Sequence, residues 1–275
     1  MPGGDALDAV DGLVRRALAE RGERLLVVGL CGAQGSGKST LAEGLRQRLE
    51  RAGVPVAILS IDDLYLTRAE REALAIAVHP LLRTRGVPGT HDVSLGLRVI
   101  EALERGEAAP LPRFGKAMDD RLPEARWARA AAGTRLLLLE GWCVGAQPQD
   151  AAALAVPVNA LERKEDAQGI WRGFVNHALA GDYQALFARL DRLVMLAAPG
   201  FGVVRRWRTQ QEQELRQAAG AAAGMPDAEV ARFIQHFERL TRHMLDEMPG
   251  RADMVIALDA ARRVTGIMGA QDRTT

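Results

Sequence analysis

A glycine-rich segment, GAQGSGKST at residues 32–40, constrains the fold of this 275-residue chain more than any other feature. It follows an apolar run at residues 25–31 and leads into a helix-forming stretch at residues 41–51. The spacing G-x-x-x-x-G-K-[ST] between a strand and a helix is that of a phosphate-binding loop, or P-loop. In such a loop the backbone N–H groups surround phosphate oxygens at the positive end of a helix. The segment therefore predicts an α/β protein that binds a nucleoside triphosphate.

Two residues of the P-loop have predicted roles beyond phosphate binding. Lys38 is expected to reach the β- and γ-phosphates during catalysis, and the Ser39 hydroxyl is expected to ligate Mg²⁺. Only three of the 36 basic residues are lysines, at positions 38, 116 and 164. A compact ammonium suits a phosphate site where a planar guanidinium does not, so Lys116 is a second candidate for a functional lysine. The residues predicted to bind the nucleotide are Gly32, Ala33, Gln34, Gly35, Ser36, Gly37, Lys38, Ser39 and Thr40.

Five short apolar runs predict buried parallel strands, at residues 25–31, 54–61, 135–140, 193–197 and 254–258. The segments between them have the amphipathic or charged character of helices, at residues 41–51, 93–105, 203–219 and 227–247. A further helix is expected within residues 1–22, before the first strand. Strands that alternate with helices form a parallel sheet covered on both faces. We therefore expect a P-loop NTPase fold of three α/β/α layers, with a mainly parallel five-stranded sheet, in a single domain over residues 1–275.

The composition is that of a soluble globular protein, with 48% hydrophobic and 26% charged residues. A net charge of +1 gives no whole-protein case for binding nucleic acid or an anionic membrane. Cys31 and Cys143 are too few to make a disulfide framework. The first residues lack the apolar centre of a signal peptide, and no apolar run approaches the ~20 residues of a membrane helix. These features predict a cytoplasmic protein without nucleic-acid or membrane partners, and they leave its oligomeric state open.

Acidic residues follow two of the predicted strands. The second strand leads into SIDDLYLT at residues 60–67, where Asp62 is the candidate to orient and deprotonate an acceptor hydroxyl. Asp63 is assigned to the substrate side as a second polar support of the site, and the alternative is the N-cap of a helix. Tyr65 is a further candidate for contact with the substrate. Glu140 follows four leucines and is predicted to act on Mg²⁺, directly or through water, or else to cap the loop after the strand.

Two segments rich in proline, glycine and arginine, residues 78–92 and 109–127, fit regular structure poorly. Long irregular insertions are usually functional or disordered. Both are expected near the carboxyl edge of the sheet, where open α/β folds bind ligands, so residues 78–127 are assigned to the acceptor side of the pocket. Arg205, Arg206 and Arg208 lie in a candidate lid helix at residues 200–220. Arg206 and Arg208 are predicted to bind the transferring phosphate, and the alternative is a solvated helical face.

Four segments in sequence order, GAQGSGKST, SIDDLYLT, RGVPGTHD and LLLLEGW, resemble the P-loop small-molecule kinases that include uridine kinase, phosphoribulokinase and pantothenate kinase. The segment at residues 85–92, the EGW after the third strand and W-R-x-x-Q-E at residues 207–212 are most similar to the D-glycerate 3-kinase type. The resemblance covers about residues 25–259. It implies that Asp62 activates the acceptor hydroxyl and that Ser39 and Glu140 lie on the magnesium side. Where that type is expected to show F-D-K-S, this chain has Gly115 and Ala117 on either side of Lys116.

The sequence and the resemblance together predict a kinase that uses ATP and Mg²⁺ to phosphorylate an alcohol group. The acceptor is expected to be a small hydroxy acid, with D-glycerate as the first candidate. Arg85, His91, Lys116 and Arg121 are predicted to meet its carboxylate, since arginine binds a carboxylate through a bidentate fork. Another acceptor on the same scaffold, such as pantothenate, a nucleoside or a sugar phosphate, is the first alternative. The second is a nucleotide-dependent regulatory ATPase that has no small acceptor.

Overall fold

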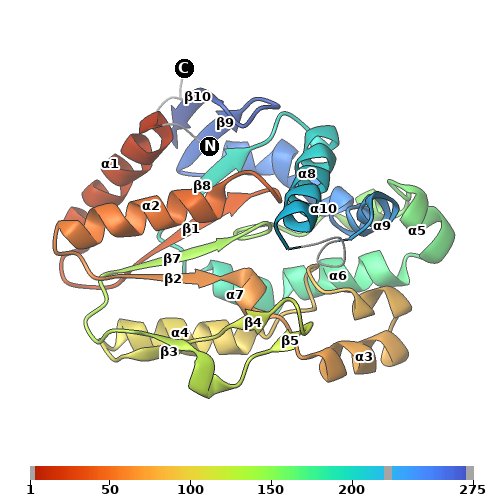
Figure 1. Cartoon of the computed structure of the whole chain (residues 1–275), viewed down its shortest axis with the longest axis horizontal. Coiled ribbons are helices and arrows are strands. Elements are labelled where there is room, and N and C mark those ends of the chain that lie inside the picture. Colours follow the sequence, from red (N-terminus) through yellow and green to blue (C-terminus); the bar gives the residue numbers. More distant parts are fainter. Residues whose placement is uncertain (1–3, 220–224, 271–275) are drawn as a thin grey trace.

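A six-stranded sheet forms the centre of the computed structural model, which describes residues 4–219 and 225–270 (Figure 1). Its strands are β1 (Leu26–Gly32), β2 (Val56–Ser60), β7 (Leu136–Gly141), β8 (Arg192–Ala197), β9 (Met254–Leu258) and β10 (Val264–Gly269). Their order across the sheet is β10-β9-β8-β1-β7-β2. The pairs β2·β7, β1·β7, β1·β8 and β8·β9 are parallel, and β10 is antiparallel to β9. All residues of β1 and β7 are buried, so both faces of the central strands are covered.

The five strands predicted from apolar runs are all present, but the predicted sheet is one strand short. The missing strand, β10, lies at the edge of the sheet beside β9. Its sequence, VTGIMG, has no continuous apolar run, and none of its residues is fully buried. An antiparallel strand at the edge of a parallel sheet is common. Such a strand is half exposed, so hydrophobicity alone does not reveal it.

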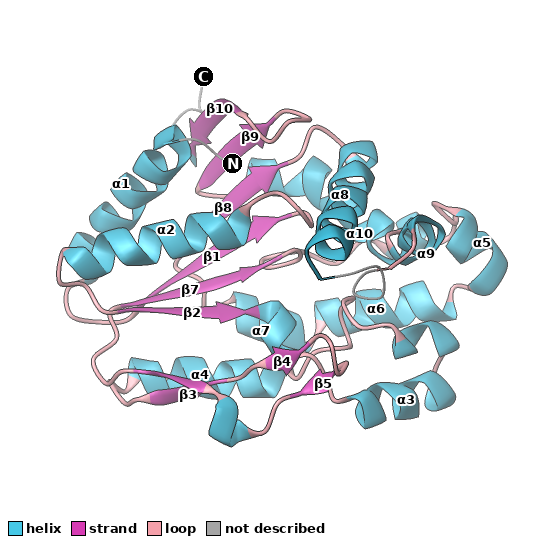
Figure 2. Ribbon diagram, viewed as in Figure 1, coloured by secondary structure: helices cyan, strands magenta, loops and turns pink. Residues whose placement is uncertain are grey.

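Two long helices lie along the sheet, and the second of them begins at the P-loop (Figure 2). The first, α1 (Gly4–Arg21), contacts β1 and β10 and matches the helix expected before the first strand. The second, α2 (Lys38–Arg51), contacts β1, β2 and β7. It begins at Lys38 because Gly37, at φ 90°, turns the chain from the P-loop into the helix. Beyond β2 lie α4 (Val93–Glu104) and α7 (Asp182–Phe187), which contact each other (Figure 1).

The two segments expected to be irregular contain short regular elements beyond the edge strand β2 (Figure 1). After α3 (Arg68–Ala77) comes a 3₁₀ turn, Pro80–Arg83. Farther along, two antiparallel ribbons pair β3 (Ala109–Leu111) with β6 (Ala128–Ala130) and β4 (Phe114–Gly115) with β5 (Asp120–Arg121). Strands of two or three residues leave almost no periodic signal in a sequence.

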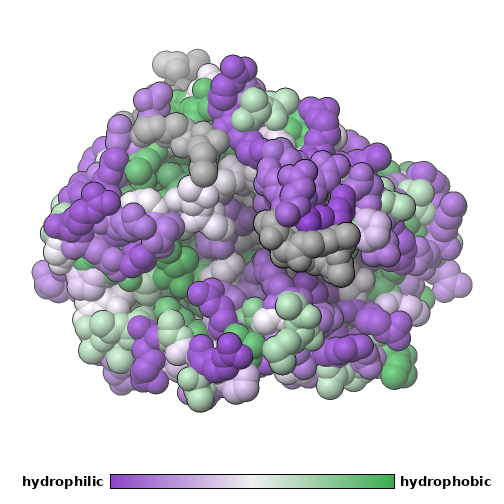
Figure 3. Space-filling model, viewed as in Figure 1, coloured by the Kyte–Doolittle hydropathy of each residue, from purple (hydrophilic) through white to green (hydrophobic). Residues whose placement is uncertain are grey.

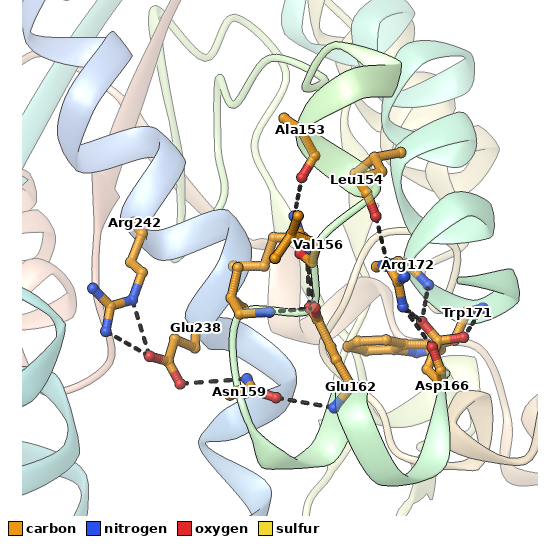
Figure 4. A network of polar contacts seen from close by, with 12 residues as sticks. Ala153, Leu154, Val156, Asn159, Glu162, Asp166, Trp171, Arg172, Glu238 and Arg242 are labelled. Atoms are coloured by element: carbon orange, nitrogen blue, oxygen red, sulfur yellow. Dashed lines mark hydrogen bonds and ion pairs between the residues drawn. The ribbon is translucent and has the colours of Figure 1, made fainter. Parts of the chain in front are cut away.

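The remaining helices are α5 (Ala160–Glu165), α6 (Ile170–Ala180), α8 (Phe201–Ala219), α9 (Asp227–Phe233) and α10 (Gln235–Glu247). The helix expected at residues 203–219 lies within α8. The stretch expected as one helix, residues 227–247, forms α9 and α10, which are separated at Ile234. A network of polar contacts joins α5 and α10 (Figure 4), in which Asn159 donates to Glu238 and Arg239 donates to Glu162. Asn159 also donates to the backbone oxygen of Gln235, the first residue of α10. This network fixes the start of α10, directly after α9.

The face shown in Figure 3 is mostly hydrophilic over α2 and α8, with hydrophobic side chains scattered between them. Among the helices that the structure describes, none combines the length and the apolar character needed to cross a membrane.

Candidate active site

A cavity of about 220 Å³ opens at the carboxyl ends of β1, β2 and β7. Ligands bind at this edge of the sheet in open α/β folds. The P-loop, the segment after β2, the end of β7, both insertions and the helices α8 and α9 all contribute to it. The lining residues are Gln34, Gly35, Lys38, Ser39, Ser60, Asp62, Tyr65, Arg85, Lys116, Glu140, Trp142, Arg208, Gln211 and Phe233.

The P-loop has the backbone geometry of a phosphate cradle. Gly35 and Gly37 both have positive φ, at 80° and 90°, a conformation that favours glycine. Gly35 is also tightly packed, because a Cβ added there would lie 2.8 Å from the Cβ of Trp207 in α8. The loop is therefore held between the start of α2 and the side of α8. Gln34, Gly35, Lys38 and Ser39 reach the cavity directly, and the other P-loop residues shape the turn around it.

Glu140 places a carboxylate beside the P-loop, as the sequence predicts. Its Oε1 atom accepts a hydrogen bond of 3.2 Å from Ser39, and its Oε2 atom lies 4.0 Å from Lys38 Nζ. The Glu140 side chain is buried, and within the described residues Oε2 has no hydrogen-bond partner. Within residues 4–219 and 225–270, no group of three His, Cys, Asp or Glu side chains is placed to hold a metal. Mg²⁺ in phosphoryl-transfer sites usually takes one or two protein ligands together with phosphate oxygens and water. The pair Ser39 and Glu140, whose Oε2 atom accepts no hydrogen bond among the described residues, fits that coordination.

Asp62 faces the cavity between two donors. Tyr65 donates a hydrogen bond of 2.6 Å to Oδ1, and Lys116 donates one of 2.8 Å to Oδ2. Burial on its own would raise the pKa of Asp62, but Lys116, Lys38 and the Tyr65 hydroxyl outweigh it and lower this pKa to about 2. Asp62 is therefore ionised at neutral pH. The pKa of Tyr65 is raised, first by burial and then by the nearby Asp62, so the phenol remains a donor.

Asp63 points away from this cavity, although it adjoins Asp62 in the sequence. It accepts hydrogen bonds from the backbone N–H of Phe114 at 3.0 Å and from Arg113 at 2.9 Å. The side chain that caps the 3₁₀ turn here is Ser60, which accepts from the Asp62 N–H. Asp63 does not line the cavity, so it is not placed for the predicted contact with the substrate, and its bonds make it a polar support and not an N-cap. Asp63 holds the β4–β5 ribbon, which carries Lys116, against the end of β2.

The four residues predicted to meet an acceptor carboxylate divide into two pairs. Arg85 and Lys116 line the cavity, and the Arg85 guanidinium lies 5.4 Å from the Phe114 ring centroid. His91 and Arg121 lie behind Tyr65 instead. The His91 ring stacks on Tyr65 at 4.8 Å, and burial lowers the pKa of His91 to about 4. Arg121 donates to the Tyr65 backbone oxygen at 3.0 Å, so both residues position Tyr65.

Only one of the two predicted lid arginines reaches the cavity. Arg208 lines it, forms an ion pair with Glu212 and lies 5.5 Å above the Phe233 ring. Arg206 is exposed on the same helix and does not line the cavity. Gln211 also lines the cavity and was not predicted, although it is three residues after Arg208 and shares its helix face, a spacing that could have identified it. Phe233, the last residue of α9, lines the cavity as well and has no local signal in the sequence.

Trp142, the last residue of the EGW segment, is a further lining residue that was not predicted. Its indole N–H donates a hydrogen bond of 2.7 Å to the backbone oxygen of Gly86. This contact ties the end of β7 to the first insertion.

Comparisons with known proteins give a consistent set of relatives. A family model described as "Methylmalonyl Co-A mutase-associated GTPase MeaB" matches residues 6–65, which contain most of α1, the P-loop and β2. The chain is 39% identical over 225 residues to "Uncharacterized kinase mug58" of Schizosaccharomyces pombe, covering 78% of this chain and 79% of that protein. It is 31% identical over 223 residues to the chloroplastic D-glycerate 3-kinase of Arabidopsis thaliana, covering 77% of this chain and 46% of that protein. A solved structure of D-glycerate 3-kinase from Cryptococcus neoformans superimposes with a TM-score of 0.80 at 26% identity, covering 97% of this chain and all of that one.

Proposed function

The chain belongs to the P-loop small-molecule kinases close to D-glycerate 3-kinase, and we propose that it transfers the γ-phosphate of ATP to an alcohol oxygen of a small hydroxy acid. D-Glycerate is the first candidate. The observation that carries this proposal is the position of Asp62. Its carboxylate lines the same cavity as Lys38 and Glu140 of the phosphate side and Arg85 and Lys116 of the insertions.

The two sides of the cavity suit the two substrates. On one side, the P-loop backbone and Lys38 would bind the β- and γ-phosphates, and Ser39 and Glu140 would hold Mg²⁺. When bound there, the metal ion would neutralise charge on the phosphate oxygens. On the other side, Arg85 and Lys116 bring positive charge to where the acceptor's carboxylate would enter. Asp62 lies between these sides and would receive the acceptor's hydroxyl.

The reaction forms a bond between the acceptor oxygen and the γ-phosphorus and breaks the bond from that phosphorus to the oxygen that leaves with ADP. The hydroxyl proton passes to Asp62 and then to solvent. With a pKa of about 2, Asp62 is a weak base for a free alcohol. The transition state of phosphoryl transfer is loose, so the alcohol becomes acidic only as the new bond forms. Asp62 therefore acts mainly by orienting the hydroxyl, and it takes the proton late. Lys38 and Arg208 would stabilise the charge on the transferring group.

A coupled assay for ADP release tests the proposal with D-glycerate, pantothenate, uridine and a set of sugar phosphates as acceptors. Turnover that depends on a hydroxy acid supports it. ATP hydrolysis that no acceptor stimulates would point to a nucleotide-dependent regulatory ATPase instead. Turnover with only uridine, pantothenate or a sugar phosphate would keep the kinase and change the acceptor.

Asp62→Asn tests the role of the carboxylate within that assay. We expect kcat to fall by about 10²-fold, the lower end of the contribution of a general base, because the amide keeps one oxygen to orient the hydroxyl but cannot take its proton. Calorimetry should show unchanged affinity for ADP. Asp246→Asn is a matched control, because Asp246 is exposed on α10 and should leave both quantities unchanged. Near-normal turnover of the Asp62→Asn enzyme would refute the assignment.

A further inference from the structure

Both carboxylate oxygens of Asp62 have partners within the protein, Tyr65 on Oδ1 and Lys116 on Oδ2. Each oxygen keeps a further lone pair, so an acceptor hydroxyl still has room to bind. That hydroxyl would meet a carboxylate whose charge is already neutralised by the ammonium of Lys116. A carboxylate in such an ion pair attracts a hydroxyl proton less strongly than a free one.

The two partners of Asp62 differ in their freedom to move. Tyr65 is only 5% exposed, and its ring is held between the stacked His91 ring at 4.8 Å and the edge of Phe114 at 5.1 Å. The side chain of Lys116, by contrast, is 63% exposed. It is also a flexible four-carbon chain. The Tyr65 contact is therefore fixed, whereas the Lys116 contact can break without any change in the fold.

The backbone of the β4–β5 ribbon is anchored beside Lys116. Breaking the contact between Lys116 and Asp62 would therefore move mainly the Lys116 side chain. Asp119 follows Lys116 by three residues and binds both Arg71 and Arg85. Arg71 is buried and also donates to the backbone oxygens of Asp119 at 2.8 Å and Arg83 at 2.7 Å. Arg85 is thus held by its ion pair with Asp119, and Arg85 also lines the cavity. Compared with Arg85, Lys116 has the more exposed side chain and the one that is free to move.

We propose that Lys116 is a specificity-determining gate: it neutralises Asp62 until an anionic group on the acceptor draws the ammonium away. This inference rests on the proposed function. The carboxylate of a hydroxy acid then releases Asp62 for the hydroxyl of the same molecule. Water and neutral alcohols carry no such group, so they meet a neutralised Asp62. The gate therefore favours anionic acceptors and suppresses hydrolysis of ATP by water, in which the water proton would likewise pass to Asp62.

Lys116→Met tests the gate by two readouts, and the first, hydrolysis of ATP without acceptor, needs no assumption about the acceptor. We expect hydrolysis of ATP in the absence of acceptor to rise about fivefold, the upper end of what an exposed ion pair contributes. The preference in kcat/KM for D-glycerate over glycerol should fall by about tenfold or more, as expected for loss of a charge-assisted hydrogen bond. Lys116→Arg keeps the charge and should restore low hydrolysis. Lys164→Met is the matched control, because Lys164 is exposed on α5, and it should change neither quantity.

The outcomes separate the gate from simpler roles. A rise in hydrolysis that disappears in the double variant with Asp62→Asn supports the gate. A higher KM for D-glycerate with unchanged hydrolysis would make Lys116 a plain acceptor contact and overturn it. A uniform loss of all activities would make the residue structural and also overturn it. If the wild-type protein phosphorylates no hydroxy acid, yet Lys116→Met still raises Asp62-dependent hydrolysis, the proposed acceptor is wrong while control of Asp62 by Lys116 stands.

Discussion

Glu162→Gln removes one charge from a buried ion pair and keeps the shape of the side chain. The Glu162 side chain is fully buried and accepts from Arg239 Nε at 2.8 Å and Nη2 at 2.7 Å. It also accepts from the Val158 backbone N–H at 2.9 Å (the network around Glu162 is drawn in Figure 4). A glutamine amide offers one oxygen and one NH₂ group, so at least one of these donors would face another donor. The guanidinium of Arg239 would remain buried with its charge unpaired.

The expected loss follows from this geometry. Removing one partner of a buried ion pair costs about 3–5 kcal/mol of unfolding free energy, because the remaining charge is left uncompensated. A domain of roughly this size loses about 2–4 °C of Tm for each kcal/mol, so Tm should fall by roughly 6–20 °C. Glu165→Gln is the matched control on the same helix. Its partner is Arg232, and both side chains are at least 40% exposed, so the loss should stay below about 1 kcal/mol.

Urea denaturation followed by circular dichroism measures both variants. The double variant Glu162→Gln with Arg239→Met should cost less than the sum of the two single changes by about 2 kcal/mol, because the second change removes the unpaired charge. If Glu162→Gln were within 1 kcal/mol of Glu165→Gln, the pair would not be a buried, desolvated contact and the reasoning would be wrong. The network also holds the start of α10 beside Phe233, which lines the cavity. Weaker binding of ADP by Glu162→Gln is therefore expected as a second readout.

Three further predictions concern the site itself. Gly35→Ala should weaken ADP binding roughly tenfold or more, as measured by calorimetry, because the new Cβ would lie 2.8 Å from Trp207 in a left-handed backbone conformation. Unchanged affinity would contradict the packing of the P-loop on α8. Arg208→Met should lower kcat by about 10²-fold, the effect of losing one donor to the transferring charge. Arg206 is exposed, so Arg206→Met should leave kcat unchanged. Equal losses would refute a special role for Arg208. Because the pKa of Asp62 is lowered to about 2, its active ionised form persists above that value and is lost only as pH falls through it. A kcat/KM profile should therefore show no acid limb from Asp62 between pH 5 and 7, and a limb near pH 6 that vanishes in Asp62→Asn would contradict this.

The phosphate side of the cavity could be predicted because its signals are local. A buried strand, a glycine-rich turn and a polar residue after an apolar run are each readable within about ten residues. Parallel strands end at the same edge of a sheet, so Lys38, Asp62 and Glu140 were expected to lie together, and all three line one cavity. Here the geometry follows from the pattern of the sequence.

The acceptor side could not be predicted in the same way, because distant contacts decide where its side chains point. Asp62 and Asp63 are adjacent and chemically identical, yet Asp63 is turned aside by a bond to Phe114, 51 residues away. His91 was expected to contact the acceptor, and its stacking on Tyr65 places it one layer behind the cavity. Phe233 lines the cavity from the last position of α9, directly before the break at Ile234. None of these contacts leaves a periodic trace in the sequence.

The difference between this chain and the F-D-K-S pattern expected of the glycerate kinase type falls on the ribbon that carries Lys116. Gly115 and Ala117 flank that lysine and have no polar atoms in their side chains, and Arg121 on the same ribbon is directed toward the Tyr65 backbone. Within this ribbon, Lys116 is thus the residue that lines the cavity. An ammonium selects for charge and not for the pattern of hydroxyl groups around it. We therefore expect small hydroxy acids to differ from one another in kcat/KM less than each of them differs from glycerol. A strict preference for one hydroxy acid would require polar contacts from cavity residues outside this ribbon. Arg85 and Gln211 are the lining residues to test first.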